Sequence, residues 1–412
     1  MSFDADVIVA GAGPAGATAA RTLASAGLET LLVDRAAFPR NKPCGGGIST
    51  RALRRFPWLA DALAGIDQHV VSRLHLEGPD DTTIDISSPA PCVLLVRRVE
   101  FDHALVRAAL DRGAWLQTGF EITQAHADAD GVTLQSRTGD RLRAAMVVAA
   151  DGVHSVIGKR LGLNPRWPRT HLAIDMMEET SCSTLRATRP DELWAAYGHA
   201  GLDGYAYIFP KAHHVNVGVG CLLSHFDTLP DTRPDALQAA FVETLLARGL
   251  LQGHRDPATF TPYLIPVGGP LPVTGTARVL LAGDAGGFVN GVTAEGIYYA
   301  MVSGALAGEA IAAARQAGTA DAARRYTNAW RRAIGAELGD AVALQRLLFS
   351  RRGRIGDLIR QASATGPLTD AILRFFRGGL PYAALRRQIA FRHPLTAVRL
   401  VRHRRLPREV AS

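Results

Sequence analysis

Short apolar runs, each followed directly by glycine or by an acidic residue, dominate the hydrophobic pattern of this chain. They lie within 6–10, 30–33, 145–150 and 277–282. Runs of this length predict strands buried in the middle of a sheet. Longer alanine-rich stretches at 15–26 and 295–314 predict helices after the first and the last of these strands. Strands and helices in this order predict an α/β fold with a Rossmann-like domain.

A different pattern fills the middle and the end of the chain. At 205–209 and 215–220, side chains of different character alternate, which predicts strands of a sheet that packs through one face. From about residue 321 onward the sequence turns helical. We therefore expect an inserted antiparallel sheet and a helical C-terminal region beside the Rossmann-like domain.

The first strand and the first helix enclose a dinucleotide-binding fingerprint. Gly11, Gly13 and Gly16 have the G-x-G-x-x-G spacing, and the second strand ends on Asp34. In such a unit the glycines allow a tight turn and a close approach to a diphosphate, and the acid accepts hydrogen bonds from ribose hydroxyls. The pattern predicts a nucleotide-binding segment.

A second glycine-rich segment follows the last apolar strand. Asp284 can accept hydroxyl hydrogens from a sugar-alcohol chain, and Gly286 and Gly287 let the backbone approach a flat ligand. The helix that begins near Gly296 would offer its free N–H groups to negative charge. A ligand contacted from the N-terminus, from the strand before Asp151 and from Asp284 is long. FAD has that length.

Several motifs occur together along the chain. They are Gly11-x-Gly13-x-x-Gly16, Pro43-Cys44-Gly45-Gly46-Gly47, Arg98-x-x-Phe101-Asp102-x-x-Leu105, Asp151-Gly152-x-x-Ser155, Tyr205-Ala206-Tyr207-Ile208-Phe209-Pro210 and the segment 283–301. In this combination the chain resembles the geranylgeranyl reductase family of FAD-dependent oxidoreductases, in the para-hydroxybenzoate hydroxylase superfamily, over roughly residues 5–310. The resemblance implies FAD as cofactor. It also implies saturation of isolated carbon–carbon double bonds in the polyprenyl chains of lipids, pigments or quinones.

The motifs and the resemblance together give a set of expected FAD-binding residues. They are Gly11, Gly13, Pro14, Ala15, Gly16, Asp34, Arg35, Cys44, Gly45, Gly46, Arg98, Asp151, Gly283, Asp284, Gly296 and Ile297. The family places the Cys44 loop beside the flavin ring. Arg98 looks like the family arginine near the ribityl and phosphate groups, and the alternative for it is a surface salt bridge.

The resemblance also suggests residues that act on the substrate. Cys44, Tyr205 and Tyr207 are the catalytic candidates, for proton delivery or flavin tuning, while hydride passes from reduced FAD to one alkene carbon. Tyr205, Tyr207 and Phe209 would bind the prenyl chain as an aromatic wall. The alternatives are a small buried Cys44 needed for packing, and aromatic residues that are ordinary sheet core.

The chain departs from the family pattern at a few positions. Gly291 and Ala294 stand where the family usually has proline and glycine, and Tyr207 stands where it favours tryptophan. Leu202 stands where a proline often precedes the aromatic strand. The carboxylate and the glycines that FAD needs are retained, so these departures concern the substrate.

The expected domain organisation is discontinuous. The FAD-binding domain comprises 1–66, 92–170 and 275–320, the substrate domain comprises 67–91 and 171–274, and the C-terminal helical, basic region comprises 321–412. We expect the substrate cavity between the inserted sheet and the flavin ring, because pockets commonly form at domain interfaces.

Bulk properties indicate a cytoplasmic protein. The four cysteines show no C-x-x-C or metal-ligand spacing, so neither a disulfide framework nor a metal site is expected. The N-terminus has no basic segment followed by an apolar signal core. No apolar run reaches the roughly 18 residues needed to span a bilayer, so we expect no membrane crossing.

The positive charge of the chain is concentrated at its end. The whole chain carries +8, whereas the segment from Arg351 onward has fourteen arginines and three acidic residues, a local formal charge of +11. Apolar residues are interleaved with these arginines, which suits peripheral contact with the inner face of a membrane. The alternative is a solvated helical face or an acidic protein partner. Nucleic acid is not expected, because no recognised nucleic-acid motif accompanies the charge.

The sequence is also consistent with two other functions and with two different electron donors. A flavin monooxygenase that hydroxylates an aromatic or quinone substrate shares nearly every cofactor motif, and a non-catalytic flavin protein that carries lipid is a further alternative. The chain has no second fingerprint for a resident nicotinamide. NADPH would therefore bind transiently, or a reduced ferredoxin would act as a transient acidic electron carrier. Neither the particular isoprenoid nor the oligomeric state follows from the sequence.

Overall fold

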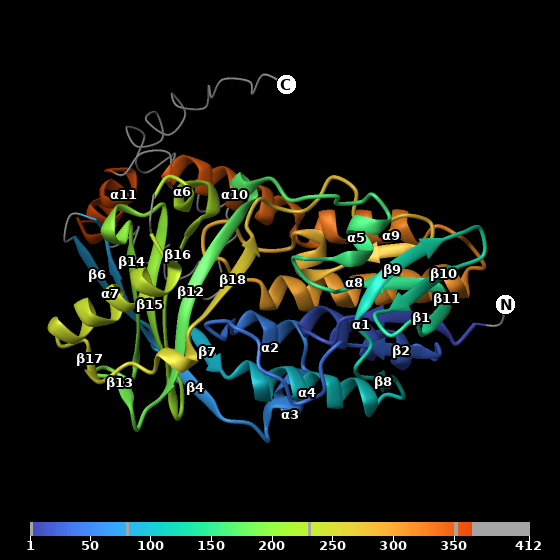
Figure 1. Ribbon diagram of the computed structural model, residues 1–412, viewed down its shortest axis with the longest axis horizontal. Coiled ribbons are helices and arrows are strands. Elements are labelled where there is room, and N and C mark those ends of the chain that lie inside the picture. Colours follow the sequence, from blue (N-terminus) through green and yellow to red (C-terminus); the bar gives the residue numbers. More distant parts are fainter. Residues whose placement is uncertain (1–2, 80–81, 230–231, 350–352, 365–412) are drawn as a thin grey trace.

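The computed structural model describes residues 3–79, 82–229, 232–349 and 353–364. Two large sheets lie side by side along the long axis of the molecule, and long helices run between and beside them (Figure 1). The N-terminus lies at the Rossmann-like end.

The first large sheet carries the Rossmann-like half. Its order is β8–β2–β1–β11–β10–β9, and β19 pairs with β11. The strands are β1 (Ala5–Ala10), β2 (Thr30–Val33), β8 (Trp115–Gln117), β9 (Ile122–Ala127), β10 (Val132–Ser136), β11 (Arg141–Ala149) and β19 (Val279–Leu281). Pairs among β8, β2, β1, β11 and β19 are parallel, whereas β9, β10 and β11 pair antiparallel. The carboxyl ends of the parallel strands meet at one edge, which brings Gly11, Asp34, Asp151 and Gly283 together.

Helices cover this sheet closely. They are α1 (Pro14–Ser25), α4 (Arg98–Leu110), α8 (Ile297–Gln316) and α9 (Ala322–Trp330). α1 packs against both α4 and α8. A Cβ at Gly304 of α8 would lie 2.1 Å from the carbonyl oxygen of Ala15 in α1, so only glycine allows this approach.

α8 differs from the expectation that no apolar run is long enough to cross a membrane. It is the one helix in the described part of the chain that has the length and apolar composition of a membrane span. However, 83% of its most apolar window is buried inside the protein, between helices such as α1 and α9. Its composition is therefore that of a core helix.

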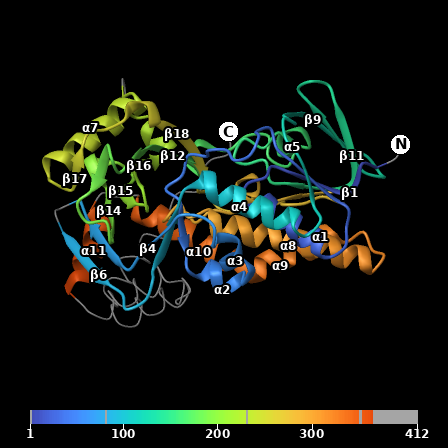
Figure 2. The same ribbon diagram turned by 90° about the horizontal axis from the view of Figure 1, so that it is seen from below.

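The second large sheet has the order β18–β12–β16–β15–β14–β5–β6. The strands are β5 (Arg73–Glu77), β6 (Thr83–Ser87), β12 (Leu172–Ser181), β14 (Glu192–Tyr197), β15 (Gly204–Pro210), β16 (His214–Leu222) and β18 (Thr261–Pro266). All neighbours pair antiparallel except β14 and β5, which are parallel. α7 (Pro234–Ala247) packs on its outer face through Phe241, Val242 and Leu245 (Figure 2). The other face is turned toward the first half.

Smaller elements complete the two halves. A three-stranded sheet has the order β3 (Gly47–Ser49), β7 (Val93–Val96) and β4 (Gln68–Val71), and β13 (Leu185–Ala187) pairs with β17 (Leu251–Gly253). The short helices are α2 (Arg51–Arg55), α3 (Trp58–Leu63), α5 (Val156–Arg160) and α6 (Leu223–Phe226), and 3₁₀ turns cover Arg169–His171, His199–Gly201, Pro257–Thr259 and Gly283–Gly286.

The C-terminal helices pack on both halves. α9 continues through a π-helical turn, Arg331–Gly335, into α10 (Ala336–Leu348), and α11 (Gly353–Ala364) follows. Leu348, Ile355 and Ile359 join an apolar cluster with residues of β5 and β6. The expectation of a helical C-terminal region is confirmed for this part of the chain. The arginine-rich segment 365–412 lies outside the described residues, as do Arg351 and Arg352.

The observed elements agree closely with the sequence-based predictions. The strand predicted at 277–282 is β19, the helix predicted at 295–314 is α8, and the alternating segments are β15 and β16. Segment 67–91 contributes to two sheets, because β4 joins β3 and β7 whereas β5 and β6 extend the second large sheet.

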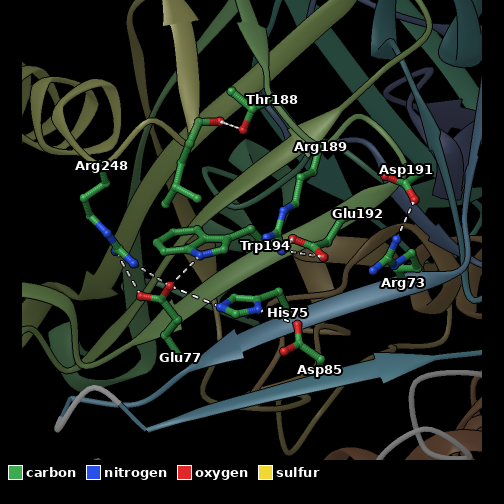
Figure 3. Close-up of polar contacts among 11 residues, drawn as sticks. Arg73, His75, Glu77, Asp85, Thr188, Arg189, Asp191, Glu192, Trp194 and Arg248 are labelled. Carbon is green, nitrogen blue, oxygen red and sulfur yellow. Dashed lines mark hydrogen bonds and ion pairs between the residues drawn. The ribbon is translucent and has the colours of Figure 1, made fainter.

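A polar network stabilises the outer face of the second sheet, beside α7. Glu77 accepts hydrogen bonds from Trp194 Nε1 (2.8 Å) and Arg248 (2.7 and 3.0 Å), and His75 lies 3.2 Å from it and 2.7 Å from Asp85 (Figure 3). Burial raises the pKa of Glu77, but the bonds from His75, Arg248 and Trp194 outweigh it and lower the pKa to about 2. The bond to Glu77 is the main cause that raises the pKa of His75.

The same corner has the composition of a weak metal site. His75, Asp85 and Glu192 bring ligand atoms within 4.8 Å of one another. Both nitrogens of His75 face carboxylates, and Glu192 faces Arg189 at 3.4 Å. These partners account for the cluster as an ion-pair network.

Replacing Glu77 with glutamine is expected to destabilise the protein by about 1–3 kcal/mol near pH 6, because charged hydrogen bonds are lost. The contribution of Glu77 is present above its ordinary pKa of 4.5 and is lost as the pH falls toward about 2. The contribution of His75 is present below its ordinary pKa of 6.5 and is lost as the pH rises through its raised value. Urea unfolding between pH 3 and 8 measures both.

The control for this prediction is Asp191→Asn. Asp191 pairs with Arg73 at 3.2 Å, but both side chains are at least half exposed. Such a pair contributes at most about 1 kcal/mol. Equal effects of the two substitutions would contradict the role assigned to Glu77.

Candidate active site

A cavity of about 600 Å³ lies between the two halves. That volume is typical of cofactor and small-molecule sites. Its walls come from the carboxyl edge of the first sheet, from the inner face of the second sheet and from α8 and α10. All the expected FAD-binding residues line it except Gly16.

The fingerprint loop packs closely against the end of β11 and against the start of α1. Gly11 has φ +95°, and a Cβ there would lie 2.3 Å from the carbonyl oxygen of Ala150. Gly16 lies beneath the loop, where a Cβ would meet the carbonyl oxygen of Gly11 at 1.8 Å. Gly16 therefore serves the packing of α1 on β1, and Gly11 and Gly13 face the cavity.

Asp34 closes the end of β2 as predicted. Its Oδ2 accepts a hydrogen bond from the Ala12 N–H at 2.8 Å, and its Oδ1 accepts one from the Ala36 N–H at 2.9 Å. Each carboxylate oxygen keeps a further acceptor position. Asp34 and its neighbour Arg35 both line the cavity.

Arg98 belongs to a buried chain of charges rather than to a surface salt bridge. It donates to both carboxylate oxygens of Asp102, at 2.7 and 2.8 Å, and the Asp102 side chain is 0% exposed. Arg40 donates to Asp102 at 3.0 Å and lies 3.7 Å from Asp34. Burial acts against the charge of Arg98, but Asp102 and Cys44 raise its pKa. Sequence reasoning missed Arg40, which lines the cavity next to Gly13.

The turn between β19 and α8 brings Asp284 to the cavity. Gly283 has φ +59° and its N–H donates to Ser303 Oγ at 2.9 Å, which fixes the turn to α8. A Cβ at Gly296 would lie 3.6 Å from Asp284 Oδ1. The first free N–H groups of the 20-residue helix α8 therefore open beside this carboxylate.

These residues fit FAD. Asp151 Oδ1 is buried without a hydrogen-bond partner among the described residues, and burial raises the pKa of this carboxyl. FAD would be held by the fingerprint loop and Asp34 at its adenosine diphosphate end, and by Asp284 and the start of α8 at its flavin end. The roles of individual residues remain predictions.

The glycine loop carries Cys44 to the junction of the two halves. Gly46 has φ +74°, and a Cβ there would meet the carbonyl oxygen of Val96 at 2.0 Å. The Gly46 N–H donates to Cys44 Sγ at 3.4 Å, and the thiol also contacts the Arg98 guanidinium. A Cβ at Gly45 would lie 2.8 Å from the Phe209 ring. Glycine at 45 thus lets this loop contact the second sheet, and glycine at 46 lets it contact the end of β7.

A buried ion pair secures the same junction. Lys211, at the end of β15, donates to Glu179 of β12, and Arg97 donates to Glu179 at 3.0 Å. Burial is the main cause that lowers the pKa of Lys211. Its Nζ would be 2.9 Å from a Cβ at Gly46. Sequence reasoning missed this lysine, although it follows the aromatic motif directly.

The aromatic strand faces the cavity as an ordered wall. The rings of Tyr205 and Tyr207 are 6.0 Å apart, and those of Tyr207 and Phe209 are 4.4 Å apart. All three line the cavity, whereas Ala206 and Ile208 between them pack toward α7. The Tyr205 hydroxyl donates to the carbonyl oxygen of Thr293 at 2.7 Å, which links the wall to the segment before α8.

Asp175 of β12 is a third residue that sequence reasoning missed. It is 8% exposed, lines the cavity and accepts hydrogen bonds from the Tyr207 hydroxyl at 3.1 and 3.3 Å. Burial raises its pKa to about 6, although Tyr207 and Lys42 act in the opposite direction. The available signal was an acid inside the apolar stretch Leu172–Met177.

The start of α8 is tied to the C-terminal helices. Arg51 pairs with Glu337 of α10 at 2.8 Å and with Glu295 at 3.6 Å. The Tyr299 hydroxyl donates to Glu337 at 2.8 Å. Burial raises the pKa of Glu295, and its Oε1 lacks a partner among the described residues. The segment that follows Asp284 is therefore held rigidly against α2 and α10.

Comparison with known proteins agrees with this site. A family model described as FAD binding domain matches residues 4–255, which is more than half of the chain. A menaquinone reductase of Mycobacterium tuberculosis is 32% identical over 340 residues, which cover 75% of this chain and 77% of that protein. A digeranylgeranylglycerophospholipid reductase of Methanocella arvoryzae is 31% identical over 358 residues, with 82% and 86% covered.

A solved structure shares the fold over nearly the whole chain. It is a geranylgeranyl bacteriochlorophyll reductase-like protein from Thermoplasma acidophilum, with a TM-score of 0.81, 21% identity and coverage of 97% and 98% of the two chains. The flavin-dependent halogenase CmlS is more distant, with a TM-score of 0.67, 21% identity and coverage of 85% and 66%. The chain belongs to the geranylgeranyl reductase family of FAD-dependent oxidoreductases, as its motifs predict.

Proposed function

We propose that this protein uses FAD to saturate carbon–carbon double bonds in a polyprenyl chain of a lipid, pigment or quinone. The observation that carries this proposal is the apolar part of the cavity wall, which the inner face of the second sheet and its neighbours supply. Its lining includes Leu76, Leu193, Ala195, Tyr197, Tyr205, Val292 and Phe349. The names of the relatives support the same substrate class.

This apolar wall arises from strand alternation. Leu74 and Leu76 of β5, with Leu193 and Ala195 of β14, pack together on the inner face, whereas Trp194 points toward α7. Such a wall offers dispersion contacts along a methyl-branched chain and few polar partners. A prenyl chain fits it better than a small polar ring.

The protein's own residues would position the alkene and supply a proton. When bound and reduced, FAD supplies the hydride. The aromatic wall would hold a trisubstituted double bond close to the flavin and keep water out, because an isolated alkene is a poor hydride acceptor. Cys44, Tyr205 and Tyr207 remain the candidates that the sequence predicts for proton delivery or flavin tuning.

The electron source and the location in the cell are part of the proposal. We propose that NADPH binds transiently or that reduced ferredoxin delivers electrons. The net charge of +8 would suit an acidic carrier. The protein would be cytoplasmic and would dock on the inner face of the membrane through its basic C-terminal segment. Docking would spare a prenyl lipid the passage through water, which costs about 0.8 kcal/mol per exposed methylene.

An anaerobic single turnover tests the function. The FAD-loaded protein is reduced with dithionite, mixed with menaquinone or with a digeranylgeranyl glycerophospholipid, and followed by flavin absorbance. Reoxidation with products that stay two daltons heavier per saturated bond after the quinone ring has been reoxidised in air is the expected result, because reduction of the ring alone also adds two daltons. A flavin that stays reduced until oxygen enters, followed by hydroxylation of an aromatic or quinone ring, would favour the monooxygenase instead. Bound lipid with a flavin that no donor reduces would indicate a carrier.

A further inference from the structure

We infer that Asp175 and Tyr207 form the proton-donating pair of the reaction. The Tyr207 hydroxyl delivers the proton to the alkene carbon that does not receive the hydride, and Asp175 replaces that proton. The inference rests on the proposed function and assigns the acid that the family resemblance left open between Cys44, Tyr205 and Tyr207.

The placement of the two side chains supports this role. Tyr207 and Asp175 lie on the inner face of the second sheet, on β15 and β12, with β16 between them. Their polar atoms are 3.1 and 3.3 Å apart, and both residues line the cavity. On the other side the Tyr207 ring faces Gly45 of the glycine loop, where a Cβ would lie 3.6 Å from the ring. The tyrosine therefore stands between Asp175 and the loop next to the expected flavin ring.

Glycine in the intervening strand makes the contact possible. Gly218 pairs with both Tyr207 and Met177, and a Cβ at Gly218 would lie 2.4 Å from the Tyr207 ring and its hydroxyl oxygen. The ring lies flat across this glycine and so reaches the next strand. Any other residue at position 218 would push the ring away from Asp175.

The surroundings keep both groups in the protonation state that the role needs. Burial raises the pKa of Tyr207 well above its ordinary value, so the hydroxyl keeps its proton at neutral pH. The groups that face Asp175 and its partner are Lys42, Tyr205, Tyr263 and Cys44. Of these, Lys42 lies 4.0 Å from the Tyr263 ring centre, and it is the cation that acts on Asp175.

The step balances in atoms and electrons. The hydride from reduced FAD forms one C–H bond, and the π electrons of the alkene form the second with the Tyr207 proton. The O–H bond of Tyr207 breaks as the Asp175 carboxyl proton moves to the tyrosine oxygen. Asp175 ends as a carboxylate and regains a proton from solvent after product leaves. The alkene is reduced by two electrons and the cofactor is oxidised by two.

A titration of the oxidised, FAD-loaded protein tests the pair without any substrate. Difference infrared spectra between pH 4 and 8 are expected to show a carboxylic acid band that disappears through about pH 6. The band should be absent in Asp175→Asn and shifted in Tyr207→Phe. Asp151 and Glu295 are buried carboxyls whose pKa is also raised, so the band of Asp175 is the one that differs between the wild type and Asp175→Asn. A difference band that titrates at the ordinary pKa of an aspartate, or the lack of any difference band, would overturn the pairing.

A single-turnover series tests the donor role. Because the proton is held by Asp175, the rate of flavin reoxidation by a prenyl substrate should fall as the pH rises through about 6. Asp175→Asn and Tyr207→Phe should each lower the rate about 100-fold or more and abolish this pH dependence, with substrate affinity unchanged. Asp175→Glu should restore part of the rate. Tyr205→Phe should keep the pH dependence, because the Tyr205 hydroxyl donates to Thr293 and not to Asp175.

Two glycine variants separate geometry from chemistry. Gly218→Ala should displace the Tyr207 ring and reproduce the loss of pH dependence. Gly220→Ala is the matched control, because its Cβ would meet the Ile174 carbonyl oxygen at 3.4 Å and Asp175 Oδ1 at 3.7 Å without a clash. If Gly218→Ala does not fold, the Asp175 and Tyr207 variants decide alone.

The outcomes distinguish the inference from the proposed function. No reoxidation of wild-type flavin by any prenyl substrate would overturn the function, and the donor role with it, while the infrared titration would still report on the pair. Normal turnover with an unchanged pH profile in Asp175→Asn would overturn the inference alone.

Discussion

Replacing Asp102 with alanine is expected to lower the free energy of unfolding by about 3–5 kcal/mol, because the substitution leaves a buried guanidinium without its counter-ion. Arg98 is 4% exposed and both of its bonds to Asp102 would be lost. Arg40 would also lose its shorter carboxylate contact, at 3.0 Å. Urea unfolding at a fixed excess of FAD measures the change.

The double variant Arg98→Met/Asp102→Leu is the control for this prediction. Apolar residues of similar size remove both charges together, so most of the stability should return. A loss below about 1 kcal/mol in Asp102→Ala would mean that water reaches Arg98, and the buried charge chain would then be wrong.

Gly11→Ala is expected to weaken FAD binding by roughly 30- to 1,000-fold. The alanine would have to adopt φ +95° and place its Cβ 2.3 Å from the Ala150 carbonyl oxygen. Strain of about 2–4 kcal/mol is of the order expected for overpacking and a left-handed backbone together. To relieve the clash the variant loop would have to move away from Ala150, and the moved loop would no longer present its backbone to FAD, so binding is weakened. Flavin absorbance after gel filtration and a titration with FAD measure it.

The matched control is Gly27→Ala. Gly27 has φ +81°, but nothing lies within 4 Å of the position of its Cβ. Gly27→Ala introduces the backbone strain without the clash and should lower the free energy of unfolding by about 1 kcal/mol. Its FAD affinity should be unchanged. Equal loss of flavin from both variants would show that backbone strain, and not the approach to Ala150, controls binding.

Local sequence patterns predicted the FAD half because its site is made of strand ends. Gly11, Asp34, Asp151 and Gly283 each follow a short apolar run directly, and parallel pairing alone then brings them to one edge. No knowledge of long-range register was needed. For the same reason, the predicted ends of β1 and α8 lie within two residues of the observed ends.

The acid Asp175 was not predictable in this way. Its partnership with Tyr207 depends on the register of two antiparallel pairs and on Gly218 between them. A shift by one residue would turn Asp175 toward α7. Arg40 has a similar explanation, because it lies in a loop and meets Asp102 only through the packing of α4.

The part that the C-terminal helices play in the cavity was also not visible in the sequence. Gln345 of α10 donates to the carbonyl oxygen of Gly291 at 2.7 Å, and both Gln345 and Phe349 line the cavity. The helical pattern and the arginines of this region predict a surface role, and nothing local marks the buried face. Long-range packing decides which side of such a helix is covered.

The helical run from α9 through the π-helical turn into α10 contacts both halves and restrains their relative orientation. Trp330 Nε1 donates to Thr274 Oγ1 at 2.9 Å beside the first sheet, and Leu348 packs against the second sheet. Figure 2 shows α9 and α10 following one another along the two halves. Rotation of one half against the other would have to bend this helical run. Its backbone hydrogen-bond pattern changes at the π-helical turn. The width of the cavity between the two halves is thus fixed by one continuous helical run.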